Sequence, residues 1–166
     1  MAPPTEPGST VAPVLAGAGL DLRPPIAADI EARLGQGRWP EIYRQFGVDA
    51  AGLGPLTRDR VTAWLDEIAA SPTAWVIARE GRFLGEIRLR DLNRADRNAR
   101  LGIALYHPDL LGRGTGRAAI RLLLPHAFGT LGLHRISLRV LATNQRAIRC
   151  YTACGFVPEG RERDEH

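Results

Sequence analysis

Two periods in the hydrophobic pattern predict the elements of this chain. Alternating apolar and polar residues, typical of half-buried strands, predict strands at 20–23, 74–79, 82–91, 99–106 and 134–140, with a last one starting at 156–157. Apolar residues at every third or fourth position predict helices at 26–34, 57–70, 116–128 and 144–153. The pattern weakens over 37–56, where we expect a short helix and a loop. An early strand, an antiparallel middle and an alternating end predict a mixed α/β domain.

Residues that start and stop helices support these limits. Thr57 and Asn144 are suitable N-caps, and Gly155 supplies a left-handed stop after the last helix. The dipeptide Glu80-Gly81 predicts a tight turn between two strands. Pro125 lacks the backbone N–H that a helix interior needs, so we expect a kink or an early end there.

Length and composition indicate a single domain over residues 19–166. Residues 1–18 are rich in Pro, Gly, Ala and Ser and lack the features of a secretory signal, so a disordered leader is expected. No apolar run approaches the roughly 18 residues of a membrane span, so no membrane partner is expected. The two cysteines, Cys150 and Cys154, lack the partners of a metal site and fit a reducing, cytoplasmic location.

The positive charge of the chain comes entirely from arginine. The 22 basic residues include no lysine, the formal net charge is +4, and the pI is near 9.8. This balance suits weak attraction to anions. The arginines are scattered, however, and no basic run is interleaved with aromatic residues. Nucleic acid is therefore a disfavoured partner.

A glycine-rich turn, Gly112–Gly116, leads directly into the helix at 116–128. A helix N-terminus offers unpaired N–H groups and partial positive charge to a phosphate, and glycine lets the backbone approach it. Arg113 and Arg117 are placed to add charge-assisted contacts. The turn lacks the Gly-Lys-Ser/Thr of a P-loop and the G-x-G-x-x-G of a dinucleotide site. By itself it is either a phosphate cradle or merely a turn into a helix.

At these residues the chain resembles the GNAT superfamily of acyl-CoA-dependent N-acetyltransferases, in particular the branch of ribosomal-protein N-terminal acetyltransferases. The cofactor motif of the superfamily, Arg/Gln-x-x-Gly-x-Gly/Ala, is similar to residues 111–116, where Gly114 and Gly116 match and Leu111 departs. Residues 132–140 resemble a strand of that branch, and the spacing of Asn144, Tyr151 and 155–156 resembles its closing motif. The resemblance covers about 20–163.

The resemblance implies a mostly antiparallel central sheet flanked by helices, with two strands splayed to form the acyl-CoA site. It implies acetyl-CoA as the acyl-donor cosubstrate and no metal. The implied cofactor-binding residues are Ile103, Ala104, Leu105, Leu111, Gly112, Arg113, Gly114, Thr115, Gly116, Arg117, Ala118, Asn144 and Tyr151. In the implied catalytic roles, the backbone N–H near Leu105 polarises the thioester carbonyl, and Tyr151 protonates the departing thiolate.

The general base is the weakest part of this prediction. Many relatives carry Glu where this chain has Arg100, so Glu86 on the neighbouring strand is the first substitute. The alternative is that Glu86 pairs with Arg88, Arg90 or Arg100. His107, before the glycine turn, is a further candidate or a solvent-facing loop residue. Water-mediated deprotonation is enough for a protein α-amine, whose pKa is about 8.

The predicted activity is transfer of an acetyl group from acetyl-CoA to a primary amine by direct attack, through a tetrahedral intermediate. The acceptor is a protein N-terminus or a small molecule, and its pocket falls in the weakly patterned 35–56 region. The arginines at 88, 90 and 100 favour an acceptor with a carboxylate. The alternative function is a non-catalytic acyl-CoA-binding or regulatory module.

The end of the sequence departs from the family pattern. Relatives have a further strand after the one at 156–157, whereas residues 161–166 show no apolar alternation. The domain therefore either lacks that strand and exposes a sheet edge, or a partner covers it. A homodimer is one way to supply that cover.

Overall fold

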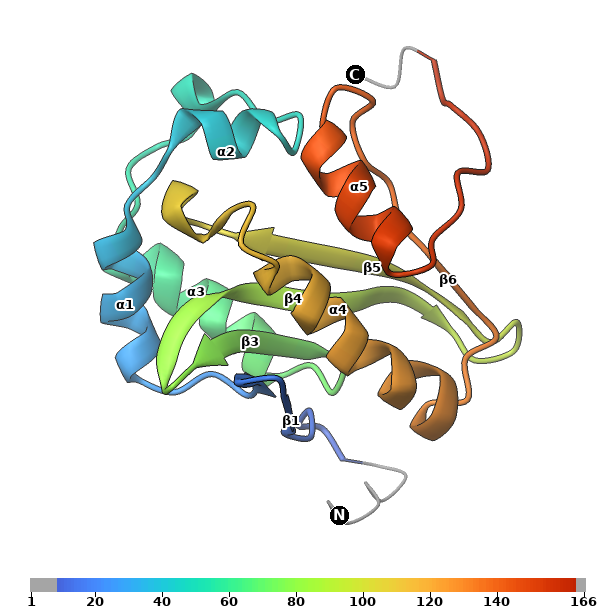
Figure 1. Cartoon of the computed structure of the whole chain (residues 1–166). Coiled ribbons are helices and arrows are strands. Elements are labelled where there is room, and N and C mark those ends of the chain that lie inside the picture. The colour runs from blue at the N-terminus through green and yellow to red at the C-terminus, as the bar shows by residue number, and fades with distance from the viewer. Residues whose placement is uncertain (1–8, 164–166) are drawn as a thin grey trace.

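A six-stranded mixed sheet forms the centre of the structure, a computed structural model that describes residues 9–163 (Figure 1). The strands run in the order β1-β2-β3-β4-β5-β6, antiparallel from β1 to β5 and parallel between β5 and β6. Their bounds are Leu15–Gly17, Leu20–Arg23, Ala74–Arg79, Arg82–Asn93, Asn98–Leu105 and Arg135–Ser137. The predicted fold class, a mostly antiparallel sheet within an α/β domain, is confirmed.

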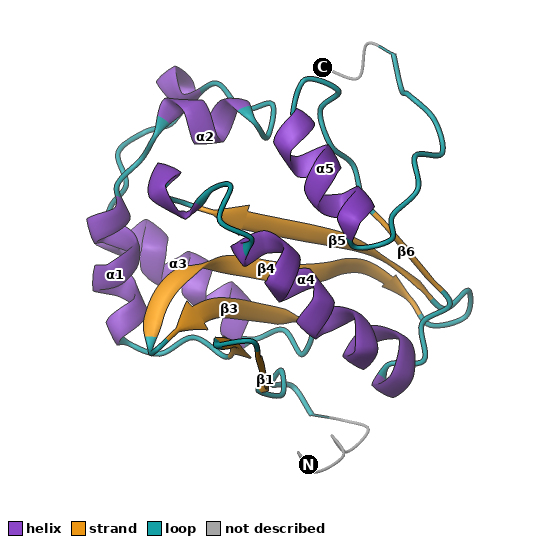
Figure 2. Ribbon diagram, viewed as in Figure 1, coloured by secondary structure: helices purple, strands orange, loops and turns teal. Residues whose placement is uncertain are grey.

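Helices cover both faces of this sheet (Figure 2). The α-helices are α1 (Ala28–Gln36), α2 (Pro40–Arg44), α3 (Arg58–Ala69), α4 (Thr115–Pro125) and α5 (Gln145–Ala153). Short 3-10 turns lie at Ala50–Gly52 and Pro108–Leu110, and a π-helical turn at His126–Thr130. The helices α1 and α3 contact each other, β3 and β4, whereas α4 contacts β1, β2 and α5.

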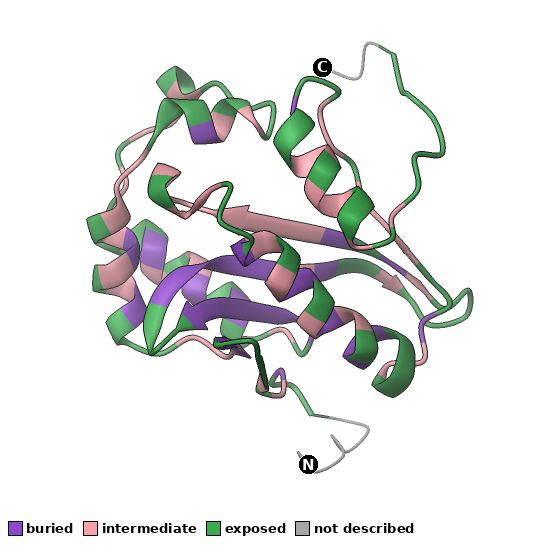
Figure 3. Ribbon diagram, in the orientation of Figure 1, coloured by how far each residue is buried: buried purple, intermediate pink, exposed green. Residues whose placement is uncertain are grey.

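Two apolar clusters hold these layers together, and Figure 3 shows the buried strands between them. Under α4, Ile120 and Leu123 pack against Trp75, and all three are fully buried. Under α3, Val61 and Ile68 belong to a separate cluster with residues of β3 and β4. Burying each such aliphatic side chain contributes about 1.5–3 kcal/mol, so both faces of the sheet require their helices.

Four predicted strands, one helix cap and one hairpin turn are present in the structure as the sequence predicted. The predicted strands at 20–23 and 74–79 are β2 and β3, and β4 and β5 match their predictions to within a few residues. Thr57 caps α3 by accepting a hydrogen bond from Arg60 N at 3.3 Å. Glu80 and Gly81 both have positive φ, 50° and 77°, as a two-residue hairpin turn between antiparallel strands demands.

The predicted disordered leader at 1–18 is wrong for its second half. Leu15–Gly17 form β1, which pairs with β2 through the turn at Ala18-Gly19. Both turn residues have positive φ, 52° and 73°, which matches the twist of a tight hairpin. Upstream, the carbonyl of Pro13 accepts a hydrogen bond from Trp75 Nε1 at 2.8 Å. Residues 1–8 of the predicted leader lie outside the described residues.

The strand predictions near the C-terminus are only partly right. The strand predicted at 134–140 is reduced to β6, Arg135–Ser137, because its pairing with β5 stops there. Phe156-Val157 form no strand, and Phe156 instead packs edge-on against Tyr151. Within residues 9–163 no strand follows β6. Segment 157–163 is held by ion pairs of Arg135 with Glu159 and of Arg139 with Glu162.

Pro125 ends α4, as its missing N–H predicted, and the chain continues as a π-helical turn. In that turn His126 is buried against Trp75, with the rings edge to face at 5.8 Å. Its Nε2 is buried and has no hydrogen-bond partner among residues 9–163. Burial therefore lowers the pKa of His126 below its usual value of 6.5.

Because the pKa of His126 is lowered in the folded state, we expect the protein to lose stability in mild acid. Because the folded state holds His126 neutral, only the unfolded chain gains that proton as the pH falls below about 6.5. The free energy of unfolding should then fall by up to about 1.4 kcal/mol per pH unit. We expect His126→Phe to flatten this decline in urea titrations between pH 7 and 5. The same change at exposed His134 is the control, and an equal effect there would contradict the assignment.

Candidate functional site

The central feature of the site is the separation of β5 from β6. The two strands pair at three positions only, Asn98 with Arg135, Ala99 with Ile136 and Arg100 with Ser137. Beyond these, β5 continues to Leu105 while β6 has ended (Figure 1). In the described part of the chain, one edge of β5 over 101–105 therefore has no strand partner, and its backbone polar groups need another one. This is the predicted splayed pair.

The glycine turn lies at the start of α4, beside this opening. Gly112 and Gly114 have φ of 71° and 80°, a left-handed conformation that favours glycine. Gly114 is the N-cap residue of α4, and its carbonyl accepts the first helical bond, from Ala118 N at 2.9 Å. The N–H groups of the first turn, which begins at Thr115, precede that bond and point out of the helix start. The turn is thus shaped to receive an anion.

Gly116 marks where β5, α4 and α5 meet. A β-carbon at this position would lie 3.6 Å from Cys150 Sγ on α5 and 3.9 Å from Ile103 Cδ1 on β5. The start of α4 is thus in contact with the other two elements that the sequence analysis expected to bind the cofactor. The structure therefore brings Ile103, Gly116 and Cys150, one residue from each predicted cofactor segment, to one place.

Tyr151 is half-buried on α5, where its ring contacts Phe156 with centroids 6.1 Å apart. Burial, with a smaller contribution from the neighbouring thiols Cys150 and Cys154, raises the pKa of Tyr151 to about 12. The phenol therefore keeps its proton at any physiological pH. A group of this kind can donate a proton to a leaving group but cannot serve as a base at neutral pH.

Asn144 is buried at the start of α5 and caps the helix as predicted. Its Oδ1 accepts a hydrogen bond from Ala147 N at 3.2 Å. Among the described residues its amide nitrogen makes no hydrogen bond. The side chain thus keeps two donors for a ligand while its oxygen serves the helix.

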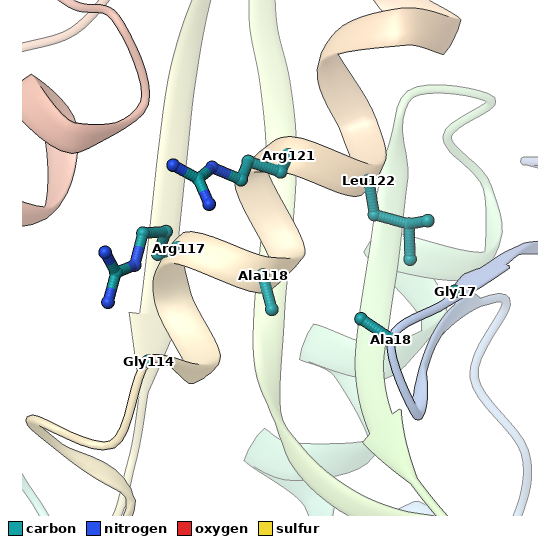
Figure 4. A pocket seen from close by; sticks show the side chains of 7 residues that line it. All are labelled: Gly17, Ala18, Gly114, Arg117, Ala118, Arg121 and Leu122. Carbon is teal, nitrogen blue, oxygen red and sulfur yellow. The ribbon is translucent and has the colours of Figure 1, made fainter.

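An open hollow of about 430 Å³ lies between α4 and the β1–β2 turn (Figure 4). It is lined by Gly17, Ala18, Gly114, Arg117, Ala118, Arg121 and Leu122. In Figure 4, Leu122 points toward the turn, whereas the two arginines extend to the other side of α4. Arg121 also donates to the carbonyl of Ala153, at the end of α5, at 3.0 Å. Positive charge therefore continues along α4 from the glycine turn.

Glu86 does not present a free carboxylate. Its Oε1 accepts hydrogen bonds from Tyr106 Oη at 2.8 Å and Trp64 Nε1 at 3.3 Å, and its Oε2 pairs with Arg88. The ion-pair alternative is thus the observed one. Simple alternation along β4 would place Glu86 on the same face as Leu84, but the two side chains lie on opposite faces. The register shifts at this position, so Leu84 joins the cluster under α4 while Glu86 faces α3.

Two of the three arginines that favoured an acceptor carboxylate, Arg88 and Arg100, are engaged as well. Arg88 also lies 3.7 Å from Glu67, and Arg100 lies 3.5 Å from Asp91, so neither is a free cation for an acceptor carboxylate. His107 accepts a hydrogen bond on Nδ1 from the backbone N–H of Asp109, at 3.2 Å. In the neutral ring the proton then sits on Nε2. In this tautomer Nε2 is a hydrogen-bond donor and cannot accept a proton from the amine.

Two residues that the sequence pattern did not single out, Arg33 and Tyr106, support the end of β5. The Arg33 guanidinium is buried 4.1 Å from the centre of the Tyr106 ring and donates to Tyr43 Oη at 3.0 Å and Gly37 O at 2.8 Å. Burial and the Glu86 carboxylate raise the pKa of Tyr106 well above its usual value. The sequence signal that could have indicated this role was the position of Arg33 on the apolar stripe of α1.

The site therefore has two sides. The glycine turn, Asn144 and Tyr151 lie on the side of α4 and α5, whereas Trp64, Glu86 and Tyr106 contact one another on the side of α1 and α3. No metal-binding cluster occurs among residues 9–163, and no helix in that part of the chain is long and apolar enough to cross a membrane.

Comparison with known proteins points to one family. The model of the acetyltransferase (GNAT) domain family matches residues 20–157. Spermidine N(1)-acetyltransferase of Vibrio cholerae is 36% identical over 77 residues, 46% of this chain and 44% of that protein. The "Putative ribosomal N-acetyltransferase YdaF" of Bacillus subtilis is 31% identical over 85 residues, 51% of this chain and 46% of that protein. The chain thus spans about half the length of the curated relatives that it matches.

Solved structures share the fold. Spermidine N-acetyltransferase from Vibrio cholerae, in complex with CoA and spermine, aligns with a TM-score of 0.70 at 24% identity, covering 87% of this chain and 84% of that one. A GCN5-related N-acetyltransferase from Brucella melitensis aligns at 0.74 and 19% identity, covering 96% of this chain and 76% of that one.

Proposed function

The chain belongs to the acetyltransferase (GNAT) domain family, and on that premise we propose that it transfers an acetyl group from acetyl-CoA to a primary amine. The observation that carries the proposal is the early end of the β5–β6 pairing, opposite the start of α4. An extended ligand can pair with the free edge of β5 while its phosphates reach the helix N-terminus.

The side of α4 and α5 is the proposed donor side, and all the predicted cofactor residues except Leu111 receive a role there. The pantetheine arm pairs with backbone groups at 103–105 and accepts a hydrogen bond from the Asn144 amide. The pyrophosphate is bound by the amides of 112–118, where Gly114 keeps the approach open and Arg113 and Arg117 add charge. These roles use the free donors described above and disturb no existing contact.

In the proposed reaction the neutral amine attacks the thioester carbonyl of acetyl-CoA. The N–H near Leu105 stabilises the oxyanion of the tetrahedral intermediate. As the C–S bond breaks, Tyr151 donates its proton to the thiolate, and the new amide releases one proton to water. The products are the N-acetylated amine and CoA, and Tyr151 regains its proton from solvent.

The side of α1 and α3 is the proposed acceptor side, and its residues favour an amine that needs no base. Glu86 is paired with Arg88, and Arg100 stands where many relatives have a glutamate. A protein α-amine, with a pKa of about 8, is substantially neutral at physiological pH, whereas an alkyl amine with a pKa of about 10.4 is almost fully charged. We therefore place this chain with protein N-terminal acetyltransferases rather than with polyamine enzymes.

This choice predicts a substrate preference. At pH 7.5 the kcat/KM for a peptide α-amine should exceed that for spermidine or a lysine side chain by about 100-fold, because the pKa difference of roughly 2.4 sets the fraction of free amine. The preference should shrink as the pH approaches 10. A peptide panel with free or blocked N-termini, assayed beside spermidine, measures it. Equal or faster turnover of spermidine at pH 7.5 would contradict it.

The proposed activity is tested by two measurements on the full chain. Acetyl-CoA should raise the melting temperature, and CoA thiol should be released only when an amine is added. Stabilisation without transfer to any amine would favour the acyl-CoA-binding module instead. Failure of acetyl-CoA to stabilise the protein would overturn both the acetyltransferase hypothesis and the binding-module hypothesis.

A further inference from the structure

The chain has two cysteines, and they lie one turn apart on α5, at positions 150 and 154. Both are free and half-buried. Both thiols turn toward the first turn of α4, with Cys154 Sγ 3.8 Å from the carbonyl oxygen of Arg117 and Cys150 Sγ 3.6 Å from the β-carbon position of Gly116. Side chains four residues apart on a helix are neighbours. The two sulfur atoms therefore converge at the start of α4, beside the opening between β5 and β6.

The distance between the β-carbons of Cys150 and Cys154 limits which kind of link can join the two sulfur atoms. A disulfide needs β-carbons roughly 3.5–4.5 Å apart, whereas positions i and i+4 place them about 5–6 Å apart. A direct S–S bond would therefore distort the last turn of α5. A single atom inserted between the sulfurs spans the larger separation without unwinding the helix.

The protonation state of the two thiols also limits which reagents can react with them. Burial raises the pKa of both Cys150 and Cys154. Reagents that require a thiolate will therefore react slowly. A reagent that carries its own oxygen to accept the two thiol protons is better suited to this pair.

We propose that Cys150 and Cys154 form a bidentate site for trivalent arsenic compounds. With phenylarsine oxide, two As–S bonds form, the bond from arsenic to the oxide oxygen breaks, and that oxygen leaves as water with the two thiol protons. Arsenic stays trivalent, so no oxidant or reductant is consumed. The phenylarsenic group then occupies the space beside Gly116.

The position of this site couples it to the cleft. The N–H groups of the first turn of α4 belong to the proposed pyrophosphate cradle, and the arsenic adduct would crowd them. Acetyl-CoA and the arsenical should therefore exclude each other. This second part rests on the proposed function, whereas the binding site itself does not.

The site is tested by treating the full chain with one equivalent of phenylarsine oxide. Intact mass should show one adduct formed with loss of one water, and thiol titration in denaturant should fall from two thiols to none. A monothiol such as N-acetylcysteine should remove the adduct far less effectively than dithiothreitol. A wild-type protein that keeps both thiols would overturn the proposal.

Cys150→Ser and Cys154→Ser are the matched controls. Each retains one thiol, so its adduct should be released by about 100-fold less N-acetylcysteine than the wild-type adduct, because the second attachment is intramolecular. Single variants that hold the arsenical as firmly as wild type would show that the pair does not act together.

The coupling is measured separately. Saturating acetyl-CoA should slow the loss of thiols at least tenfold, and the preformed adduct should abolish the thermal shift given by acetyl-CoA. If the adduct forms but the shift persists, the coupling is wrong and the dithiol site stands. If acetyl-CoA stabilises neither the adduct nor the untreated protein, the failure belongs to the proposed function.

Discussion

Replacing Tyr151 with Phe should lower kcat for acetyl transfer by about 100- to 1,000-fold, which is the range expected for loss of a general acid. The KM for acetyl-CoA should change little, because the phenol acts on the thiolate that forms only as the C–S bond breaks. Phenylalanine keeps the ring that packs on Phe156. The variant should therefore fold as the wild type does.

The pH dependence gives a second readout of the same role. Because burial raises the pKa of Tyr151 to about 12, the acid stays protonated well beyond pH 9. The wild-type kcat/KM should rise with pH as the acceptor amine loses its proton and then level off, without a falling limb before the protein unfolds. A fall centred near pH 9 would identify another group as the acid.

Tyr43→Phe is the matched control for this experiment. It removes a hydroxyl from α2 that accepts a hydrogen bond from Arg33, and it leaves α5 untouched. Its kcat should stay within a few-fold of wild type. If Tyr151→Phe is as active as this control, solvent must protonate the thiolate, and the role proposed for Tyr151 is wrong.

The donor side of the site was predictable because its signals are local in sequence. Gly112 and Gly114 have positive φ, Asn144 precedes a helical stripe, and Tyr151 follows two turns later on the same helix. Each of these signals lies within a few residues of the structure that it specifies. The glycine turn and the Asn144 cap formed as the sequence indicated.

The acceptor side was not predictable for the opposite reason. The surroundings of Glu86 depend on the register shift at Leu84, which moves side chains to opposite faces in a way that simple alternation does not show. They also depend on Trp64 and Tyr106, which are 22 and 20 residues away in sequence. The strand β1 was missed because Leu15–Gly17 are too few to alternate and are strand-like only through pairing with β2.

Gly85 is the point where this register shift meets the proposed oxyanion strand. It pairs with Leu105, and a β-carbon there would lie 2.0 Å from the carbonyl oxygen of Ala104. That oxygen belongs to the backbone and cannot rotate away as a flexible side chain can. A methyl group at this position must therefore push β4 and β5 apart beside Leu105.

Gly85→Ala should consequently impair both folding and catalysis. Overpacking of this kind costs about 1–3 kcal/mol of unfolding free energy, and displacement of the oxyanion donor by about 1 Å costs roughly 100-fold in kcat/KM. Urea titration measures the first, and acetyl transfer at a temperature where circular dichroism shows a folded protein measures the second. Gly102→Ala on β5 is the control, because its nearest atom, Arg90 Nε, is 3.8 Å away. A Gly85→Ala variant with the activity of Gly102→Ala would show that this end of β5 does not hold the reacting carbonyl.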